Sequence, residues 1–361
     1  MRRVQINELE FKGQNIYVGI DVHLKSWSVT VLSEHSVLKK FSQDSDAKAL
    51  HKYLTSNYPG ANYHSVYEAG FCGFWIHRRL VEYGINNIVV NPADVPTMSK
   101  EKLRKTDSVD SSKLARELRS GTLSGIYVPD DATLEMRSLI RLRSSIVKDT
   151  TREKNRIKSL LRFHGIDIPA EFTKHSTGNW SKRFLKWLGE VKHTTEYGKK
   201  TLDLHIDQLV RLRGMLLQET RAIRKISRSV PFSETIRLLT SVPGIGITTA
   251  ITLLVEIDDI GRFGNSDHLA SFIGLIPMCH SSGEKDGSGD ITIRKHAALR
   301  CHVIEAAWVA IRKDPAMTMV YEGYRKRMNV QKAIVKIARK LVNRIFFVLK
   351  RKQEYVPCVV K

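Results

Sequence analysis

An alternating apolar pattern over residues 16–31 constrains the fold of this chain more than any other stretch. Val18 and Ile20 alternate with small or polar neighbours at the two-residue period of a strand, and Trp27 and Val29 repeat the pattern after a short polar connection. Two strands joined in this way form a hairpin. The pattern therefore predicts a sheet at the start of the chain, with this hairpin at its centre.

The first strand of this predicted hairpin ends by presenting Asp21. A carboxylate at the tip of a central strand sits on a rigid platform, which suits a metal ligand. A solvated aspartate in an ordinary turn explains the residue equally well. The choice between the two depends on whether further carboxylates come to the same place.

The next segments alternate between strand and helix. Residues 38–58 indicate a strand end followed by a helix, residues 65–70 a strand that ends at Glu68, and residues 85–91 another strand after a helix that ends near Gly84. Strands alternating with helices at this interval favour an α/β layer with a largely parallel portion.

Residues 105–118 predict a helix with two acidic residues in its first turn. Asp107 and Asp110 are three residues apart, so their side chains share one face. Compensation of the helix dipole is the alternative explanation, because aspartate is favoured in the first turn of any helix.

The charge balance of the whole chain favours a polyanionic partner. Its 361 residues contain 59 Lys and Arg against 37 Asp and Glu, a formal net charge of +22. The positive field of such a chain attracts polyanions, and nucleic acid is the first candidate. The four cysteines lie too far apart for a zinc site, and no apolar run is long enough to span a bilayer. We therefore expect a cytoplasmic protein with reduced thiols and no membrane partner.

Residues 129–230 change character and predict long basic helices. The first carries an apolar and a basic stripe together, which suits contact with a nucleic-acid backbone or a coiled-coil seam between protomers; a solvated surface helix is the alternative. The segment 166–200 is expected to be irregular, as a lid or inserted loop, and 201–228 to return as an antiparallel helix. The residues expected to contact nucleic acid here are Arg141, Arg152, Arg156 and Lys158.

A new unit begins near Phe232. The sequence Pro243-Gly244-Ile245-Gly246 between two apolar segments is typical of a helix-hairpin-helix turn, in which the backbone around Gly244 and Gly246 contacts a phosphate; a plain helical corner is the alternative. A polar glycine-rich loop is expected at 280–290, a basic helix at 293–308 that includes Arg294, Lys295 and Arg300, and another basic helix at 331–352.

Four carboxylates, on Asp21, Glu68, Asp107 and Asp110, thus fall at two strand ends and in one helix turn. Two divalent cations about 4 Å apart need several hard oxygen ligands of this kind, and such a pair stabilises both the attacking and the leaving oxygen of a phosphodiester. The order and context of all four residues favour a metal site, although none of them does so alone.

The same residues resemble a known family. The segments that carry the resemblance are Gly19-Ile20-Asp21-Val22-His23-Leu24-Lys25, Glu68-Ala69-Gly70, Lys105-Thr106-Asp107-Ser108-Val109-Asp110, Ser241-Val242-Pro243-Gly244-Ile245-Gly246 and Gly274-Leu275-Ile276-Pro277 with Ser281-Ser282-Gly283. Over nearly the whole chain they are similar to the DEDD insertion-sequence transposases related to the Piv DNA invertases. One departure is Lys295-His296, where members of the family often carry Gly-Asn before the basic helix.

The resemblance implies an α/β plus α fold. Its parts are a RuvC-like, ribonuclease-H-type domain at 1–128, a basic helical linker or coiled coil at 129–230, a mainly helical transposase domain at 231–330, and a basic C-terminal helix and tail at 331–361.

The resemblance also implies a mechanism. Ser282 attacks DNA, with Ser281 as the neighbouring alternative, and Asp21, Glu68, Asp107 and Asp110 bind two Mg²⁺ ions, or Mn²⁺ in their place. The implied partners are donor and target DNA, a structured bridge RNA and further copies of the chain in a dimer or tetramer, in the nucleoid of a bacterial or archaeal cell.

Two other functions fit the residues. A RuvC-like structure-specific endonuclease would use metal-activated water, and Ser282 would then be an ordinary loop residue. A protein that only binds nucleic acid would use the carboxylates as helix caps and surface charges. A covalent protein–DNA adduct separates the first alternative from the transposase, and metal dependence separates the second.

Overall fold

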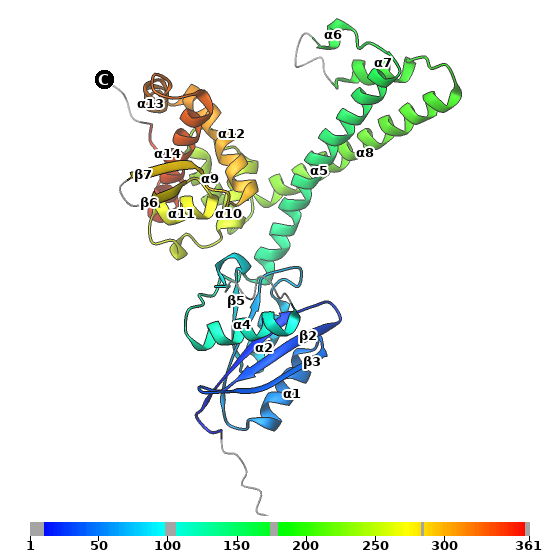
Figure 1. Cartoon of the computed structure of the whole chain (residues 1–361). Coiled ribbons are helices and arrows are strands. Elements are labelled where there is room, and N and C mark those ends of the chain that lie inside the picture. The colour runs from blue at the N-terminus through cyan, green and yellow to red at the C-terminus, as the bar shows by residue number, and fades with distance from the viewer. Residues whose placement is uncertain (1–10, 98–105, 174–179, 283–284, 358–361) are drawn as a thin grey trace, which may run out of the picture. The chain divides into compact units, whose positions relative to one another are not determined.

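The computed structural model describes residues 11–97, 106–173, 180–282 and 285–357, with the backbone alone for those of residues 279–289 that it covers. The chain divides into two compact units, one ending at Val128 and the other beginning at Pro129 (Figure 1). Within the described part of the chain, no helix is long and apolar enough to cross a membrane.

The N-terminal unit is built on a five-stranded sheet in the order β3-β2-β1-β4-β5. The strand β1 (Asn15–Val22) pairs antiparallel with β2 (Ser26–Leu32), which pairs antiparallel with β3 (Val37–Asp44). On its other side β1 pairs in parallel with β4 (Asn62–Glu68), and β4 in parallel with β5 (Asn86–Val90). The predicted hairpin and parallel portion are both confirmed.

One face of this sheet is apolar. Every second residue of the central strand, namely Ile16, Val18 and Ile20, is fully buried in a cluster with side chains of α1 (Ala47–Asn57) and α2 (Trp75–Glu82). The helices connect β3 to β4 and β4 to β5, as the alternation of strand and helix predicts. Burial of this face provides most of the apolar core of the unit.

The opposite face packs against α4 (Asp107–Arg119), which follows β5 and the short 3₁₀ turn η1 (Pro92–Asp94). The residues of β1 that point to this side are Gly19 and Asp21, two positions apart. Gly19 lets the helix come very close: a Cβ atom there would lie 2.1 Å from the carbonyl oxygen of Ser111 and 2.4 Å from the backbone nitrogen of Ala115. No side chain of an L-residue fits in that space.

The C-terminal unit begins with an antiparallel pair of long helices, α5 (Asp131–Phe163) and α8 (Glu196–Ile226). Their direction follows from cross-contacts, because Arg143 bonds to Thr220 whereas Glu153, ten residues later, bonds to His205. The predicted antiparallel return is confirmed.

The expectation of an irregular segment over 166–200 is wrong. It contains α6 (Ala170–Thr173) and α7 (Lys182–Glu190), and α8 starts within it. Phe172, Trp180 and Phe184 form an aromatic cluster that is buried against Ile157 and Leu161 of α5. Burial of these rings fixes the segment on the end of the helix pair. A lid would not be held in place in this way.

The rest of the unit is a helical bundle with one hairpin. Its helices share a core that is centred on α14, and the predicted 331–352 helix is confirmed. Its elements are α9 (Phe232–Ser241), α10 (Ile247–Ile257), η2 (Ile260–Arg262), α11 (Ser266–Ile273), β6 (Pro277–Ser282), β7 (Lys285–Ile291), α12 (Ala297–Lys313), α13 (Pro315–Arg325) and α14 (Val330–Arg351).

The expectation of a loop at 280–290 is also wrong, since β6 and β7 form a two-stranded antiparallel hairpin there. Both ends of the segment are tied together: the Thr292 N–H donates to the Ile276 carbonyl, and the Arg300 guanidinium donates to the carbonyls of Gly274 and Thr292. These bonds bring the two flanks side by side, so the polar segment between them pairs as strands. The predicted helix start at 293 moves to Ala297, which leaves Arg294 and Lys295 before the helix.

Replacement of Gly19 tests the close approach of α4. We expect Gly19→Ala to lower the free energy of unfolding by about 1–3 kcal/mol, because the added methyl group must push α4 away from the sheet. Urea unfolding of the full chain measures the loss. Gly214→Ala, in the exposed middle of α8 with nothing within 4 Å of the added methyl, is the control and should be neutral or stabilising. Equal unfolding curves for Gly19→Ala and the unmodified protein would contradict this packing.

Candidate active site

Three of the four predicted carboxylates are carried by elements that meet on the α4 face of the sheet at β1. Asp21 lies one residue before the end of β1, and Asp107 and Asp110 occupy the first turn of α4. The start of α4 is anchored by a buried hydrogen bond between the hydroxyls of Thr30 and Ser111, 2.9 Å apart. This bond and the close packing at Gly19 set the position of the two helix carboxylates.

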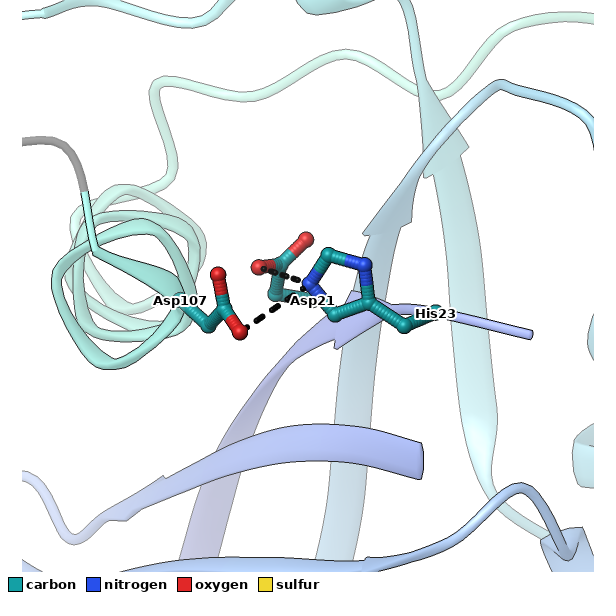
Figure 2. A group of neighbouring side chains, drawn as sticks. All are labelled: Asp21, His23 and Asp107. Atoms are coloured by element: carbon teal, nitrogen blue, oxygen red, sulfur yellow. Dashed lines mark hydrogen bonds and ion pairs between the residues drawn. The ribbon is translucent and has the colours of Figure 1, made fainter. Parts of the chain in front are cut away.

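One imidazole joins the first pair of carboxylates. The Nε2 atom of His23 lies 3.2 Å from Oδ2 of Asp21 and 3.3 Å from Oδ2 of Asp107. Figure 2 shows the three side chains converging from the end of β1 and the start of α4. One ligand atom from each residue lies within 4.8 Å of the others, a spacing that allows all three to hold one metal ion.

One lysine joins the second pair. Glu68 is the last residue of β4, as predicted, and its Oε1 lies 3.5 Å from Nζ of Lys113. The same ammonium group lies 3.6 Å from Oδ1 of Asp110, and the lysine side chain is only 9% exposed. A buried ammonium group needs such anionic partners, because burial disfavours its charged form.

The electrostatics of Asp21 link the two pairs. Burial raises the pKa of the Asp21 carboxyl, the negative charges of Asp107 and Asp110 raise it further, and His23 opposes the shift. Like charges held this close repel one another unless cations stand between them. Asp21, Asp107 and Asp110 therefore form one acidic site, to which Lys113 links Glu68. The donors of Asp21, His23 and Asp107, carboxylate oxygens with one imidazole nitrogen, fit a divalent metal ion.

The predicted nucleophile lies in the other unit. Ser281 and Ser282 are the last two residues of β6, and their backbones pair with Asp286 and Lys285 of β7. The Gly283 that follows lies outside the described residues. The backbone of both serines is therefore paired in a strand, which differs from the mobile loop expected from the glycines.

The sequence matches two transposase family models. Residues 236–322 match the model described as "Transposase IS116/IS110/IS902 family", and residues 18–166 match the DEDD transposase model named for IS110. The second match begins just before Asp21 and extends past Asp110. The chain belongs to this family of transposases.

Curated relatives agree over most of their length. The transposase of insertion sequence IS1533 from Leptospira borgpetersenii is 27% identical over 302 residues, which cover 82% of this chain and 85% of the relative. The putative transposase y4qE from Sinorhizobium fredii is 26% identical over 298 residues (81% and 71%). The transposase of IS1111A from Coxiella burnetii is 24% identical over 295 residues (79% and 77%).

Several cationic residues that we expected to contact nucleic acid have partners within the transposase. Arg141 donates two 2.8 Å hydrogen bonds to the Glu256 carboxylate, and Arg300 donates hydrogen bonds to the two carbonyls that flank the hairpin. Arg152 and Arg156 pair with acids one turn earlier on α5, and Nζ of Lys158 lies 5.9 Å from the centre of the Trp180 ring. Arg152 and Arg156 are exposed on α5 and Lys158 is half-buried, so a phosphate can still compete for these three residues.

The predicted helix-hairpin-helix turn at Gly244 and Gly246 lies between two helices, as expected. The turn connects α9 to α10, and Gly246 is the residue before the first turn of α10. Gly244 has φ = +91°, and a Cβ atom there would lie 2.2 Å from the Ala306 carbonyl oxygen of α12. A pocket of about 420 Å³ next to this turn is lined by its residues with Val309 and Lys313.

A buried glutamate that we did not predict ties three elements of the transposase together. Glu256 of α10, 2% exposed, accepts hydrogen bonds from Arg141 of α5 and interacts with His296, whose Nε2 lies 3.2 Å away. The other ring nitrogen of His296 accepts the backbone N–H of Leu299 and so caps α12. Burial alone raises the pKa of Glu256, but the bonds from His296 and Arg141 outweigh it and lower the pKa to about 2.

His23, Lys113 and Glu256 are the site and support residues that sequence reasoning missed. His23 follows Asp21 by two positions at a strand end, so both side chains point to one side, and Lys113 follows Asp110 by three positions on one helix face. Both signals were present in the sequence. Glu256 was a lone acid in an apolar helix, and nothing in the sequence indicated its partners on α5 and α12.

Replacement of Glu256 tests this network. Glu256→Gln removes a buried negative charge that lies 2.8 Å from Arg141 and 3.5 Å from Arg137, so we expect it to cost about 3 kcal/mol of unfolding free energy. The wild-type contribution is present above pH 4.5 and lost as pH falls toward 2, because the folded-state pKa lies below the usual 4.5. Urea unfolding at pH 6 and pH 3 should show a smaller pH difference in the variant.

A matched control is Glu190→Gln. Its carboxylate pairs with Lys186, and both side chains are exposed. We expect a change below about 0.5 kcal/mol at both pH values, as for ion pairs in solvent. A Glu256 variant that behaves like this control would contradict a supporting role for the buried glutamate.

Proposed function

We propose that this transposase cuts and rejoins donor and target DNA of an insertion sequence through a covalent serine–DNA intermediate. The observation that carries the proposal is the convergence of Asp21, Asp107 and Asp110 on one face of a sheet, with Glu68 joined to them through Lys113. The β3-β2-β1-β4-β5 order, antiparallel in its first three strands and parallel in the rest, is the arrangement of a ribonuclease-H-type domain, and it supports a RuvC-like nuclease unit.

The carboxylates are the proposed ligands of Mg²⁺, two ions in all, with Mn²⁺ as a substitute. When bound, such ions supply positive charge that stabilises the attacking and leaving oxygens of a phosphodiester. The role of the protein is to hold its four acids on rigid elements. Asp21 is partly buried on the sheet, whereas Asp107 is exposed and accessible to a substrate.

The proposed nucleophile is Ser282, with Ser281 as the alternative one residue away. The serine oxygen forms a bond to a DNA phosphorus, the bond from that phosphorus to a deoxyribose oxygen breaks, and the serine proton ends on the departing oxygen. One phosphodiester replaces another, so the bond energy is kept for rejoining. The reverse reaction, with a different DNA end, completes strand transfer.

The remaining parts of the proposal concern the partners. The net charge of +22, the exposed Arg152 and Arg156 and the half-buried Lys158 of α5 support binding of nucleic-acid backbones. The turn at Gly244 and Gly246, with Arg294 and Lys295 before α12, is proposed to contact further phosphates. Guidance by a bridge RNA, assembly as a dimer or tetramer, and a place in the cytoplasm beside the nucleoid rest on resemblance to the family.

Removal of single ligand charges tests the metal site. We expect Asp21→Asn, Glu68→Gln, Asp107→Asn and Asp110→Asn each to slow strand cleavage by about a hundredfold or more, since bound metal contributes several kcal/mol to transition-state stabilisation. Cleavage of a DNA fragment that carries the element's end, measured with Mg²⁺, provides the rate.

The control is Glu82→Gln on the exposed surface of α2, which should cut at the normal rate. DNA binding should change by less than about threefold in all five variants, because the basic surface is intact. Normal cleavage by several of the site variants would contradict the metal site.

The covalent intermediate has its own test. We expect Ser282→Ala to bind DNA normally and to leave no protein–DNA adduct on a suicide substrate, whereas the unmodified transposase forms one. Digestion of that adduct should leave nucleotide mass on the peptide that contains Ser282. Nucleotide mass on Ser281 would move the nucleophile by one residue. Strand cleavage with no adduct would instead support a structure-specific endonuclease that uses metal-activated water.

A further inference from the structure

The imidazole of His23 occupies an unusual place in the acidic site. Its Nε2 atom faces two carboxylates at once, at 3.2 Å from Asp21 and 3.3 Å from Asp107 (Figure 2). In an octahedral shell with bonds of about 2.1 Å, neighbouring ligand atoms lie about 3 Å apart. The nitrogen thus lies from each of the two oxygens at about the spacing of neighbouring ligands on one ion, and all three atoms lie within 4.8 Å of one another.

We infer that His23 is itself a metal ligand, so that the first divalent ion is bound by Asp21 and Asp107 oxygens together with the Nε2 nitrogen of His23. This inference rests on the metal site of the proposed function and adds one residue, with a nitrogen ligand atom, to that site. The bound ion is then held by a mixed nitrogen and oxygen set, where the four carboxylates alone would provide oxygen only.

The backbone holds His23 in this position. The strand β1 ends at Val22, and the His23 N–H donates to the Ser26 carbonyl at 3.0 Å, which closes the turn into β2. Asp21 and His23 are two residues apart along an extended chain, so their side chains leave on the same side. The His23 side chain is 48% exposed, so it does not serve to fill the core. Its described polar contacts are the two carboxylates.

The second pair of carboxylates explains why the ion is expected beside His23. Glu68 and Asp110 already share the ammonium group of Lys113, whose side chain is 9% exposed and fixed in the interior. A first ion near that pair would meet the repulsion of this buried positive charge. The Asp21 and Asp107 pair has an imidazole instead, and a neutral imidazole can donate its lone pair to a metal.

A nitrogen ligand changes which metal the site prefers. Carboxylate and water oxygens suit Mg²⁺, whereas imidazole favours transition-metal ions such as Mn²⁺. We therefore expect the transposase to bind Mn²⁺ more tightly than Mg²⁺ at this site. Replacement of His23 should remove most of that preference by weakening Mn²⁺ binding at least about tenfold, with a smaller effect on Mg²⁺.

Electron paramagnetic resonance tests the inference on the full chain, with MnCl₂ as the probe and no DNA. The Mn²⁺ titration gives the affinity, and competition with MgCl₂ gives the preference. Electron spin echo envelope modulation then detects ¹⁴N bonded to the ion. We expect ¹⁴N modulation in the unmodified protein and its loss in His23→Gln. The control His35→Gln, in the exposed turn at the other end of β2, should retain the modulation and the affinity.

The possible failures are distinguishable. Mn²⁺ bound without ¹⁴N modulation, but lost in Asp21→Asn, would overturn the role of His23 and leave the carboxylate metal site intact. ¹⁴N modulation that persists in His23→Gln would also overturn it, because another nitrogen would then be the ligand. Mn²⁺ binding that is absent, or unaffected by Asp21→Asn in a protein with an unchanged melting temperature, would overturn both the inference and the metal site on which it rests.

Discussion

The contact between the backbone of α4 and Gly19 is the constraint on which the acidic site depends. Without a Cβ atom at residue 19, the helix lies directly on β1, with Ser111 and Ala115 against the glycine. Asp21 is two residues further along the strand, and Asp107 is four residues before Ser111 in the helix. The same close approach therefore brings the two carboxylates within reach of one imidazole. A helix displaced by the width of one methyl group would separate them.

The negative charges of this site must also be balanced by nearby positive or neutral donor groups. Burial raises the pKa of the Asp21 carboxyl, the charges of Asp107 and Asp110 add to that shift, and His23 opposes it. His23 and Lys113 divide the site into two halves. The half formed by Asp21 and Asp107 is accessible and contains an imidazole that can donate a lone pair, whereas the half that contains Glu68 has the buried ammonium group of Lys113 beside it. In a chain of net charge +22, these carboxylates form a local acidic site within a basic field.

Much of the N-terminal unit could be predicted because its signals are local. Strand periodicity located β1 and β2, Glu68 stands where an apolar run stops, and the spacing of Asp107 and Asp110 defines one face of a helix turn. The distances between these residues could not be predicted, because they depend on Gly19 and on the pairing of β1 with β4. His23 lies within a quoted motif and Lys113 within the predicted 105–118 helix, yet their roles emerge only when both elements are in place.

The errors in the C-terminal unit have the same origin. A polar, glycine-rich segment has weak strand propensity, whereas Arg300 and the Thr292–Ile276 bond hold the flanks of β6 and β7 together and favour their pairing. The rings of Phe172, Trp180 and Phe184 order a segment without clear periodicity by packing on α5. Arg141 seemed available for nucleic acid until Glu256 was found beside it. In each case a long-range contact overrides the local signal.

The location of a bound ion tests the acidic site most directly. Crystals of the full chain grown with MnCl₂ can be measured at the manganese absorption edge, where an anomalous difference map shows only the metal. We predict a peak in bonding distance of Asp21 and Asp107 carboxylate oxygens, at the end of β1 and the start of α4. An ordered site in which Asp21 and Asp107 face each other as described, with manganese peaks elsewhere in the crystal but none there, would contradict a metal-dependent active site on this face of the sheet.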